Sequence, residues 1–556
     1  MNSIQGGQPS AITPAIQHIL SKTGAANGAI VPHDPTNPQD VMAFETIANA
    51  HGMTAARYPA LHQRFRAQKP LAPFANAKKL SENTGAFTDN QKLDYIATVT
   101  GGKASAHATL TRTKAVSQIF CTLSVVNVTG TITTVLATGT QTYLDLQTVE
   151  VVTNDSTAQP MVATGTNYGV FSWSVQYADG TGDTNHQSTQ WSYQAAADPV
   201  VTAPIQNPSR HSGDLNDIVI GLSRGVGDNN KTDIDYWFWQ TQYSNNTLLS
   251  PLQGSMKFLY PIAPLNATNP VLEFYLARTE GGMKELNGGA TAPYMPGFTI
   301  DTNDNTKINF SLMANPNDAG NAINFGISPW VADTRTFLTV RVTVAFQNPA
   351  FGTGWSSILS STTANVDDAD GVTYIKPIVY VWHCVAAGSL ITMSDGSTKA
   401  VELCDSNDVV QSGATTRTVL ATLAQPHWGV VYVITLANGA TLTCSGTHPF
   451  ITPAGPQQAS TLAVGSTVSV AGGTSTVSAI TQQQQSGAPL FNLWLDPGPA
   501  GQTVMTVNGI VVGDYQMQVA LLQSAQTDPA RLRAAIPEYL HTDLASYLED
   551  RAATST

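Results

Sequence analysis

The chain contains four cysteines whose thiols could act as nucleophiles: Cys121, Cys384, Cys404 and Cys444. No two of them form a C-x-x-C pair, so their spacing predicts neither a zinc site nor a dense disulfide framework. A cysteine thiol can attack the carbonyl carbon of the preceding residue through a five-membered ring, and the amide between them then becomes a thioester. At Cys384 that carbonyl belongs to His383, and the proximity of thiol and carbonyl would supply much of the reduction in the barrier.

Three ordered blocks of sequence begin at Cys384. The first reads CVAAGSLITM, continues through the turn SDG and ends on VEL at residue 403. The second, TLTCSGTHPFIT, spans residues 441–452, and the third is FNLWL followed by VNGIVVGD, which ends at residue 514. Together the blocks resemble the Hint domain, the self-processing module shared by inteins and hedgehog proteins. The resemblance covers residues 384–515, roughly a quarter of the chain.

The resemblance implies an all-β, horseshoe-like domain that attacks its own backbone through Cys384. The thiol would replace the His383–Cys384 amide with a thioester by an N-to-S acyl shift. The departing nitrogen needs a proton, and His448, which stands on the motif histidine, takes the role of general acid. Ser445 stands on the motif threonine, whose hydroxyl hydrogen-bonds the scissile carbonyl. The activating aspartate of hedgehog-type domains has no match here, and His427 could serve as a base in its region.

Departures from the family pattern limit how far this chemistry can go. Inteins end on His-Asn, where the asparagine cyclises to cut the C-terminal junction, whereas this chain has Gly513-Asp514. Tyr515 replaces the Cys, Ser or Thr that would accept the transferred chain, and Asn492 replaces an aspartate of the third block. We therefore expect no splicing, but thioester formation and capture of the thioester by water, a thiol or an amine.

Each of these residues also has a simpler interpretation. A free cysteine is often a buried core residue, and this alternative applies to Cys384 as well as to Cys404 and Cys444, for which core packing is the expectation. His448 could be a structural imidazole in a turn before a proline. His427 could be an ordinary loop residue.

Two features of the central part of the chain could hold ligands. Acidic residues that could supply oxygen ligands for calcium are Asp214, Asp217, Asp228, Asp233 and Asp235. Their spacing matches no calcium loop, so solvated turns are the better interpretation. The run Tyr236-Trp237-Phe238-Trp239 could form an aromatic platform, but packing with a period of two is favoured. We predict no metal site and no cofactor.

Length and periodicity predict a mainly β protein of several domains, because 556 residues exceed what one core organises. The predicted parts are residues 1–95 as short helices in a polar linker, 96–205 and 206–383 as two β-sandwich-like modules, 384–515 as the Hint domain, and 516–556 as a helical tail packed on the domain before it. The alternation of Ile119, Cys121 and Leu123 with Phe120, Thr122 and Ser124 predicts a strand, as does the run over residues 336–346. Residues 372–382 predict a buried antiparallel strand, and residues 38–48 a helix capped by Asp40.

Composition indicates which partners and which location are expected for the protein. Only 12% of the residues are charged and the formal net charge is −12, which disfavours nucleic-acid binding because that needs a basic face. No apolar run is long enough to span a bilayer, and the first residues lack the pattern of a Sec signal peptide. The low charge is typical of proteins outside the cytoplasm, so an extracellular, cell-surface or particle-associated location is expected.

Two functions of different classes follow from these observations. The first is a precursor whose Hint domain cleaves or conjugates at the His383–Cys384 bond in a single turnover, with its own chain as substrate, and releases an N-terminal β-rich binding or structural module. The second is an extracellular or particle-associated structural or adhesive protein whose Hint fold is inactive.

Overall fold

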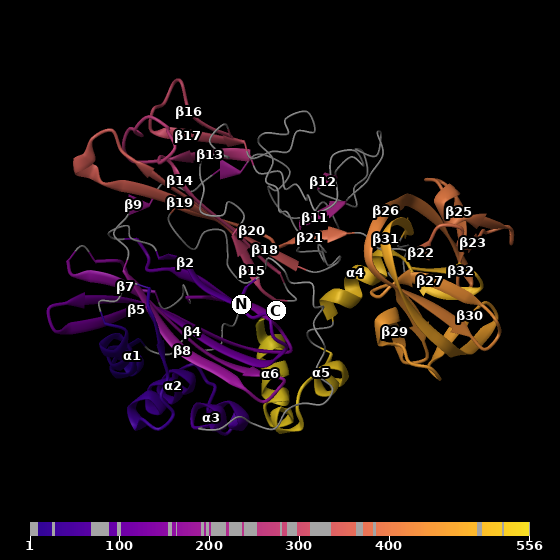
Figure 1. Cartoon of the computed structure of the whole chain (residues 1–556), viewed down its shortest axis with the longest axis horizontal. Helices are drawn as coiled ribbons and strands as arrows, with labels where there is room; N and C mark the ends of the chain where they lie inside the picture. Colours follow the sequence, from indigo (N-terminus) through magenta and orange to yellow (C-terminus); the bar gives the residue numbers. More distant parts are fainter. Residues whose placement is uncertain are drawn as a thin grey trace.

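The computed structural model describes residues 9–24, 28–67, 88–96, 102–153, 158–162, 164–190, 194–195, 200–201, 218–221, 236–237, 253–278, 281–285, 297–311, 335–362, 371–381, 385–496, 503–524 and 528–554. The fold is mainly β, as predicted (Figure 1). Three parts are named here by their residues: the first β region (9–190), the second β region (194–381) and the C-terminal β region (385–524). Among the described residues, no helix is long and apolar enough to cross a membrane.

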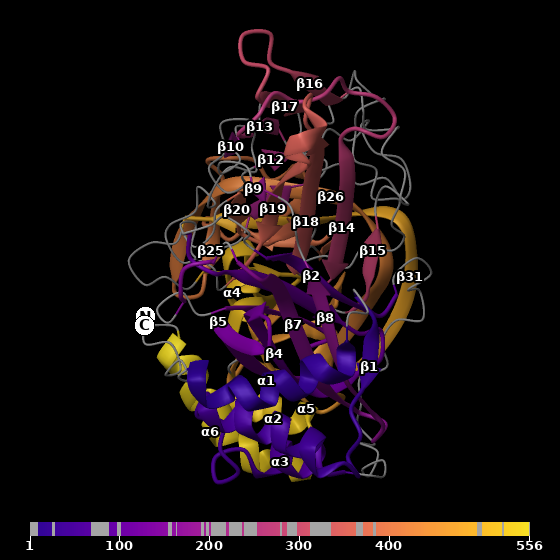
Figure 2. The same cartoon turned by 90° about the vertical axis from the view of Figure 1, so that its left-hand side faces the viewer.

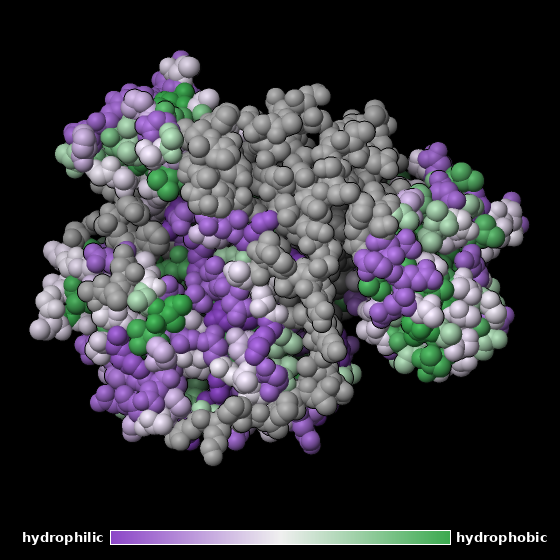
Figure 3. Space-filling view, viewed as in Figure 1, coloured by the Kyte–Doolittle hydropathy of each residue, from purple (hydrophilic) through white to green (hydrophobic). Residues whose placement is uncertain are grey.

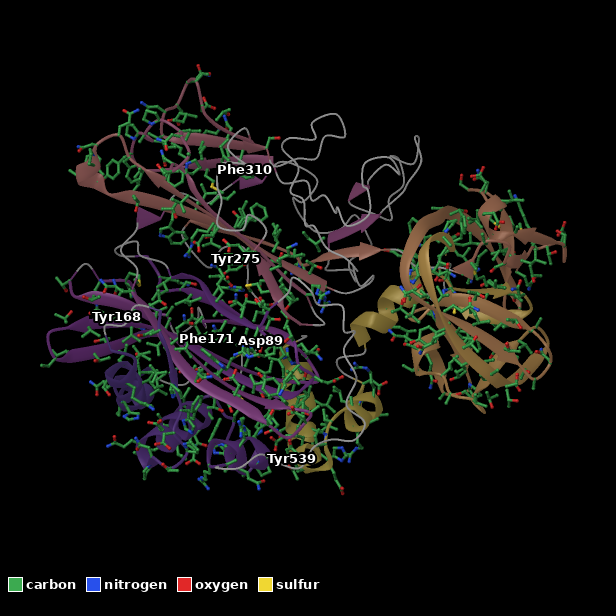
Figure 4. The ribbon with its side chains drawn as sticks, viewed as in Figure 1. Asp89, Tyr168, Phe171, Tyr275, Phe310 and Tyr539 are labelled. Atoms are coloured by element: carbon green, nitrogen blue, oxygen red, sulfur yellow. The ribbon has the colours of Figure 1, made fainter. Side chains whose placement is uncertain are left out.

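The first β region contains two antiparallel sheets that share one core. The five-stranded sheet has the order β1 (Ile30–Pro32), β8 (Gly182–Gln190), β7 (Thr166–Tyr177), β4 (Val116–Thr129) and β5 (Ile132–Leu144). The three-stranded sheet has the order β2 (Asn90–Ile96), β3 (Ala106–Thr111) and β6 (Thr148–Val152). Ile119, Cys121 and Leu123 alternate along β4 and lie in the core that also holds Leu110 of β3. Phe171 of β7, labelled in Figure 4, lies in the same core. The predicted alternation of β4 is therefore confirmed.

Helices cover the other face of the five-stranded sheet (Figures 1 and 2). They are α1 (Pro9–Thr23), α2 (Pro38–Ala50) and α3 (Pro59–Phe65). Phe120 of β4 packs between this sheet and the helices, against Phe44 of α2 and Phe65 of α3. The face of β4 that carries Phe120 is therefore buried. Hydrophilic residues cover much of the outside of this helical layer (Figure 3). The helices expected in a polar linker are thus part of a core, and β2 continues across the predicted boundary at residue 95.

The cap of α2 differs from the prediction. Asn37, not Asp40, stands at the N-cap, and its Oδ1 accepts a hydrogen bond of 2.9 Å from the backbone N–H of Gln39. Asp40 lies inside the first helical turn and is fully buried. Its carboxylate accepts a hydrogen bond of 2.7 Å from the backbone N–H of Asp34 instead.

The C-terminal helices α5 (Pro529–Ala535) and α6 (His541–Thr554) belong to the same helical layer. Their apolar face packs into the cluster around Phe44 and Phe65 through Leu532, Ile536 and Leu544. The expectation that the whole tail packs on the domain before it is wrong for these two helices. The helix α4 (Tyr515–Ser524) packs on the C-terminal β region as expected, whereas α5 and α6 cover the large apolar cluster that lies on the first β region.

The second β region is built on a nine-stranded sheet. Its path is β12 (Tyr236–Trp237), β11 (Ile218–Gly221), β21 (Ile378–Val381), β18 (Arg335–Ala345), β14 (Val271–Arg278) and β15 (Met283–Glu285), with β19 (Thr353–Ser360), β20 (Val372–Ile375) and β9 (Gln194–Ala195) beside it. A smaller sheet has the order β10 (Val200–Val201), β13 (Gln253–Lys257), β17 (Lys307–Ser311) and β16 (Phe298–Ile300).

The two strand predictions in this region have different outcomes. The strand expected over residues 336–346 is confirmed as β18. The single antiparallel strand expected over residues 372–382 is wrong, because two short strands lie there: β20 runs parallel to β19, and β21 runs antiparallel to β18. Pro377 separates them, since proline has no N–H to continue a ladder.

A buried ionic network joins the first and second β regions. The Nδ1 atom of His107 lies 2.6 Å from Asp94 Oδ2, and its Nε2 lies 3.1 Å from Glu150 Oε2. From the second region, the hydroxyl of Thr339 donates to Asp94 at 3.2 Å and that of Thr362 to Glu150 at 2.5 Å. These hydrogen bonds fix the contact of the two regions at specific residues.

The C-terminal β region is a twelve-stranded arrangement around two long strands, β26 (Thr415–Leu436) and β31 (Gly473–Leu495), which pair antiparallel along their length. The others are β22 (Val385–Ala386), β23 (Leu390–Thr392), β24 (Thr398–Ala400), β25 (Val409–Ser412), β27 (Thr441–Ser445), β28 (Pro449–Thr452), β29 (Gly455–Gln458), β30 (Thr467–Val470), β32 (Val504–Val507) and β33 (Ile510–Gly513). The Asn508-Gly509 turn between β32 and β33 has positive φ at both residues, which is the conformation that the Asn-Gly pair favours in a hairpin.

Candidate functional site

The serine and the histidine of the second sequence block are brought together by one tight turn. Ser445 ends β27 and His448 comes directly before β28, and the backbone N–H of His448 donates to the Ser445 carbonyl at 3.2 Å. Ser445 is 4% exposed and His448 is not exposed at all. The turn between the two strands therefore directs both polar side chains into the protein.

Both side chains are buried without hydrogen-bond partners among the described residues. This holds for the Oγ of Ser445 and for both ring nitrogens of His448. A buried polar group without a partner costs roughly 1–3 kcal/mol, so such groups are rare unless something else requires them. Burial lowers the pKa of His448 to about 3, so the ring is neutral at pH 7.

Cys384 and His383 lie outside the described residues, but the residue after them is placed. Val385 in β22 pairs antiparallel with Cys444 of β27 and with Phe491 of β31. The start of the first block therefore lies beside the residue that precedes Ser445, between the second and third blocks. The fold brings the three sequence blocks together at one place.

His427 is not placed in this turn. It lies on β26 opposite Ala488, it is 8% exposed, and its Nε2 lies 3.4 Å from the carbonyl oxygen of Val430. The residue of β26 that pairs with Ser445 is Val431. His427 lies four residues before Val431 on this strand, which is a distance of roughly 13 Å at 3.3 Å per residue. Burial lowers the pKa of His427 as well.

Side-chain hydrogen bonds connect the turn that holds Ser445 and His448 to β31 and α4. The Nδ2 of Asn492 donates to Gln518 Oε1 at 3.2 Å, and the Nε2 of Gln518 donates to the Thr447 hydroxyl at 2.8 Å. Asn492 and Gln518 are both fully buried. Gln518 lies on α4, beyond the predicted end of the domain, and Thr447 directly precedes His448. Gln518 and Thr447 were missed by the sequence reasoning, because only the docking of α4 on the region gives Gln518 a partner there.

Asp514 has a structural role in the helix that follows it. Its carboxylate accepts hydrogen bonds from the backbone N–H groups of Leu495 at 3.1 Å and Met517 at 3.2 Å, and from the hydroxyl of Thr503. The bond from Met517 satisfies a free N–H in the first turn of α4, as an N-cap does. Burial outweighs these bonds and raises the pKa of Asp514 to about 7.

The other candidate residues lie in the core or outside the described residues. Cys404 and Cys444 are buried core thiols, as expected, and Cys121 lies in the core of the first β region. Asp214, Asp217, Asp228, Asp233 and Asp235 lie outside the described residues, as do Phe238 and Trp239. The calcium and aromatic-platform interpretations are therefore not addressed by the structure.

Comparison with known proteins gives matches to solved structures alone. No family model matches the chain, and no curated protein matches it. Similar structures include the gp41-1 intein (19% identity, TM-score 0.22), a DnaB intein from Synechocystis sp. PCC 6803 (17%, 0.22) and a bacterial intein-like domain from Clostridium thermocellum (20%, 0.22). Each match covers 24% of this chain and 99% of the other.

Proposed function

We propose that residues 384–515, together with α4, form a Hint-type self-processing domain that makes a thioester at Cys384. The pairing of Val385 with Cys444 supports this most directly. Cys444 directly precedes Ser445 in the chain, so Val385 lies on the strand next to the turn that holds Ser445 and His448. That turn offers a buried hydroxyl and a buried imidazole that have no partners among the described residues.

The proposed reaction is an N-to-S acyl shift at the His383–Cys384 bond. The sulfur of Cys384 forms a bond to the carbonyl carbon of His383, and the bond from that carbon to the Cys384 nitrogen breaks. One proton leaves the thiol and one proton must reach the departing nitrogen. Because burial keeps His448 neutral at pH 7, the thiol proton can pass to this imidazole as the sulfur bonds to the carbonyl carbon, and the imidazolium then delivers it to the departing nitrogen as general acid.

Ser445 has the role of a hydrogen-bond donor to the carbonyl of His383. The negative charge of the tetrahedral intermediate develops on that oxygen, and a donor held in a water-poor site stabilises it more than a donor in water would. The second step transfers the acyl group of residues 1–383 from sulfur to water, an external thiol or an amine, which regenerates the Cys384 thiol. The domain acts once on its own chain.

The pathway ends at this stage because the C-terminal junction of an intein is missing. Asp514 stands on the position of the cyclising asparagine, and its carboxylate serves as an acceptor for Thr503, Leu495 and Met517. A carboxylate side chain cyclises much less readily than an amide, and Gly513 provides no imidazole to assist it. Cleavage or conjugation at Cys384 is proposed, and splicing is not.

The C-terminal helices revise the expectation that cleavage releases the N-terminal module. Asp543 of α6 accepts hydrogen bonds from the backbone N–H groups of Ala60 at 2.9 Å and Leu61 at 3.0 Å. Asp550 accepts 2.6 Å and 2.5 Å bonds from Arg57 and Tyr58. We propose that the two products stay together as a nicked complex, since the fragment that starts at Cys384 ends in helices packed on the other fragment.

Intact mass under nucleophiles tests the proposal. The full chain, Cys384→Ala and the core variant Cys404→Ala are incubated with and without dithiothreitol or hydroxylamine under native conditions, then denatured and weighed. A break after His383 in the full chain and in Cys404→Ala, but not in Cys384→Ala, is the expected result. An intact chain under every condition would contradict it and would favour the structural or adhesive protein with an inactive Hint fold.

A further inference from the structure

Three side chains that are far apart in the sequence converge between the helical layer and the edge of the five-stranded sheet. His33 follows β1, Asp40 lies in the first turn of α2, and His186 lies on β8 opposite Val31. One ligand atom from each of the three residues lies within 4.8 Å of the others. We propose that His33, Asp40 and His186 form a binding site for a divalent transition-metal ion, with zinc as the best chemical match.

The free nitrogens of the two imidazoles support this site. The Nε2 of His33 lies 3.0 Å from the carbonyl oxygen of Phe65, so it carries the proton and leaves a lone pair on Nδ1. The Nδ1 of His186 lies 2.9 Å from the hydroxyl of Ser172. Both remaining nitrogens, Nδ1 of His33 and Nε2 of His186, are buried and have no hydrogen-bond partner within the part of the chain that the structure describes. Metal-ligating histidines show this division, with one nitrogen on the metal and the other held by a hydroxyl or carbonyl group.

The two imidazole rings pack against the ring of Phe44. His186 is fully buried, and the ring of Phe44 lies 4.9 Å from its ring and 5.1 Å from that of His33, between centroids. Burial lowers the pKa of both histidines, that of His186 to about 3, which keeps their lone pairs available. Two neutral imidazoles and a carboxylate are ligands that zinc prefers.

Lys22 and His18 already bind the carboxylate that the ion would need. The ammonium of Lys22 hydrogen-bonds Asp40 Oδ2, and the Nε2 of His18 lies 2.7 Å from Oδ1. Burial opposes ionisation of Asp40, but these bonds outweigh it and lower its pKa to about 2. The side chains of Lys22 and His18 are 21% and 19% exposed, so Lys22 can turn into solvent when a cation takes its place. His18 or water is then available as the fourth ligand.

Zinc binding would close the site slightly and would stabilise the layer. Ligand atoms about 2.0–2.2 Å from a tetrahedral ion are roughly 3.4 Å apart, so atoms that now lie within 4.8 Å of one another must approach by up to about 1.4 Å. The ion would connect the edge strands β1 and β8 with α2. The site is independent of the reaction proposed at Cys384, so failure of one proposal leaves the other untouched.

Zinc binding by the full chain tests the site. Metal is first removed from the full chain with a chelator, followed by dialysis. Isothermal titration with zinc and elemental analysis of the zinc-loaded protein should then both give one ion per chain. His33→Gln and His186→Gln should each weaken the affinity at least about 100-fold, and Lys22→Met should strengthen it roughly tenfold by removing the competing cation. The matched control is His62→Gln, a buried histidine of the same layer that hydrogen-bonds the Met53 carbonyl at 2.8 Å and should leave binding unchanged.

A second readout keeps the proposal testable if a variant folds poorly. Cobalt added to the metal-free chain should give the visible absorption of a tetrahedral site, and this absorption should be lost in the two histidine variants and kept in His62→Gln. The proposal is overturned if the full chain and Lys22→Met both fail to bind zinc, which would leave the two nitrogens to a bridging water. It is also overturned if His33→Gln and His186→Gln, folded by circular dichroism, bind as the full chain does.

Discussion

At the scale of single residues, the reaction that we propose depends on two polar groups that the fold buries. Ser445 and His448 have no hydrogen-bond partners among the described residues, and the same turn holds both. A stable protein keeps such groups buried at a cost, so their presence beside the strand that begins at Val385 is the strongest argument for a reaction there.

His448→Gln should slow cleavage by dithiothreitol at least 100-fold, because general acid–base catalysis contributes about 10²–10⁴. The rate is measured from intact masses over time. His427→Gln is the matched variant, and we expect its rate to stay within about threefold of the full chain, since that side chain lies away from the turn. A loss in His427→Gln as large as that in His448→Gln would restore His427 as the base.

Asp514 should make stability depend on pH. Burial raises the pKa of Asp514 from 3.8 to about 7. The stability that the protonated carboxyl contributes is therefore fully present below pH 3.8 and is lost as the pH rises through 7. The free energy of unfolding should fall by up to about 1.4 kcal/mol per pH unit in that window, relative to Asp514→Asn, which cannot ionise. Denaturant unfolding of both proteins at pH 4.5, 6 and 7.5 measures the difference. A constant difference across the three values would contradict the assignment.

At the scale of elements, the turn that holds His448 depends on a helix outside the family pattern. Gln518 of α4 bridges Asn492 and Thr447 through amide hydrogen bonds and is fully buried. Gln518→Leu should cost about 1–3 kcal/mol because it leaves the Asn492 amide without its acceptor. It should also slow thioester formation about tenfold by loosening Thr447, and Gln516→Leu, at a half-buried position of the same helix, serves as control. Stability is measured by denaturant unfolding and the rate by intact mass; an unchanged rate would mean that α4 does not position the turn.

The ionic network at the junction of the two N-terminal β regions predicts a second pH dependence. Burial opposes the charge on His107, but hydrogen bonds to Asp94 and Glu150 outweigh it and raise its pKa to about 9. The stability that the charged His107 contributes is therefore fully present below pH 6.5 and is lost as the pH rises through 9. The carboxyl pKa values are lowered, so their contribution is present above about pH 4.5 and is lost on acidification. Thermal unfolding should show a stability maximum between about pH 4.5 and 6.5 that His107→Gln removes.

At the scale of the whole molecule, α5 and α6 hold the end of the chain against the first β region, so the two products of the proposed cleavage would stay in contact. After cleavage, size-exclusion chromatography should show both fragments in one peak, with two masses on denaturation. A double variant that breaks the contacts of α6, Asp543→Lys with Leu544→Asp, should let the fragments separate. The control is Ala545→Lys, which places a charge at an exposed position of the same helix. Separation of the unmodified fragments would restore the release model.

The sequence alone determined the local features of this protein. Alternating hydrophobicity placed β4 and β18, because a strand presents every second residue to its core. The three blocks that resemble a Hint domain pointed to Ser445 and His448, and the structure places both in one turn, because the spacing of a tight turn is local. The same reasoning failed at residues 372–382, where Pro377 breaks a run that is continuous in hydrophobicity alone.

Only the tertiary structure decided which distant segments meet. Local patterns could predict the helicity of α5 and α6, but their place on the first β region depends on a cluster that includes Phe44, Phe65 and Phe120. Neither His33 nor His186 stands in a motif, since the residues that surround them belong to different elements. The docking of α5 and α6 and the meeting of His33 with His186 depend on burial and on contacts between distant segments. The spacing of residues along the chain does not predict such contacts.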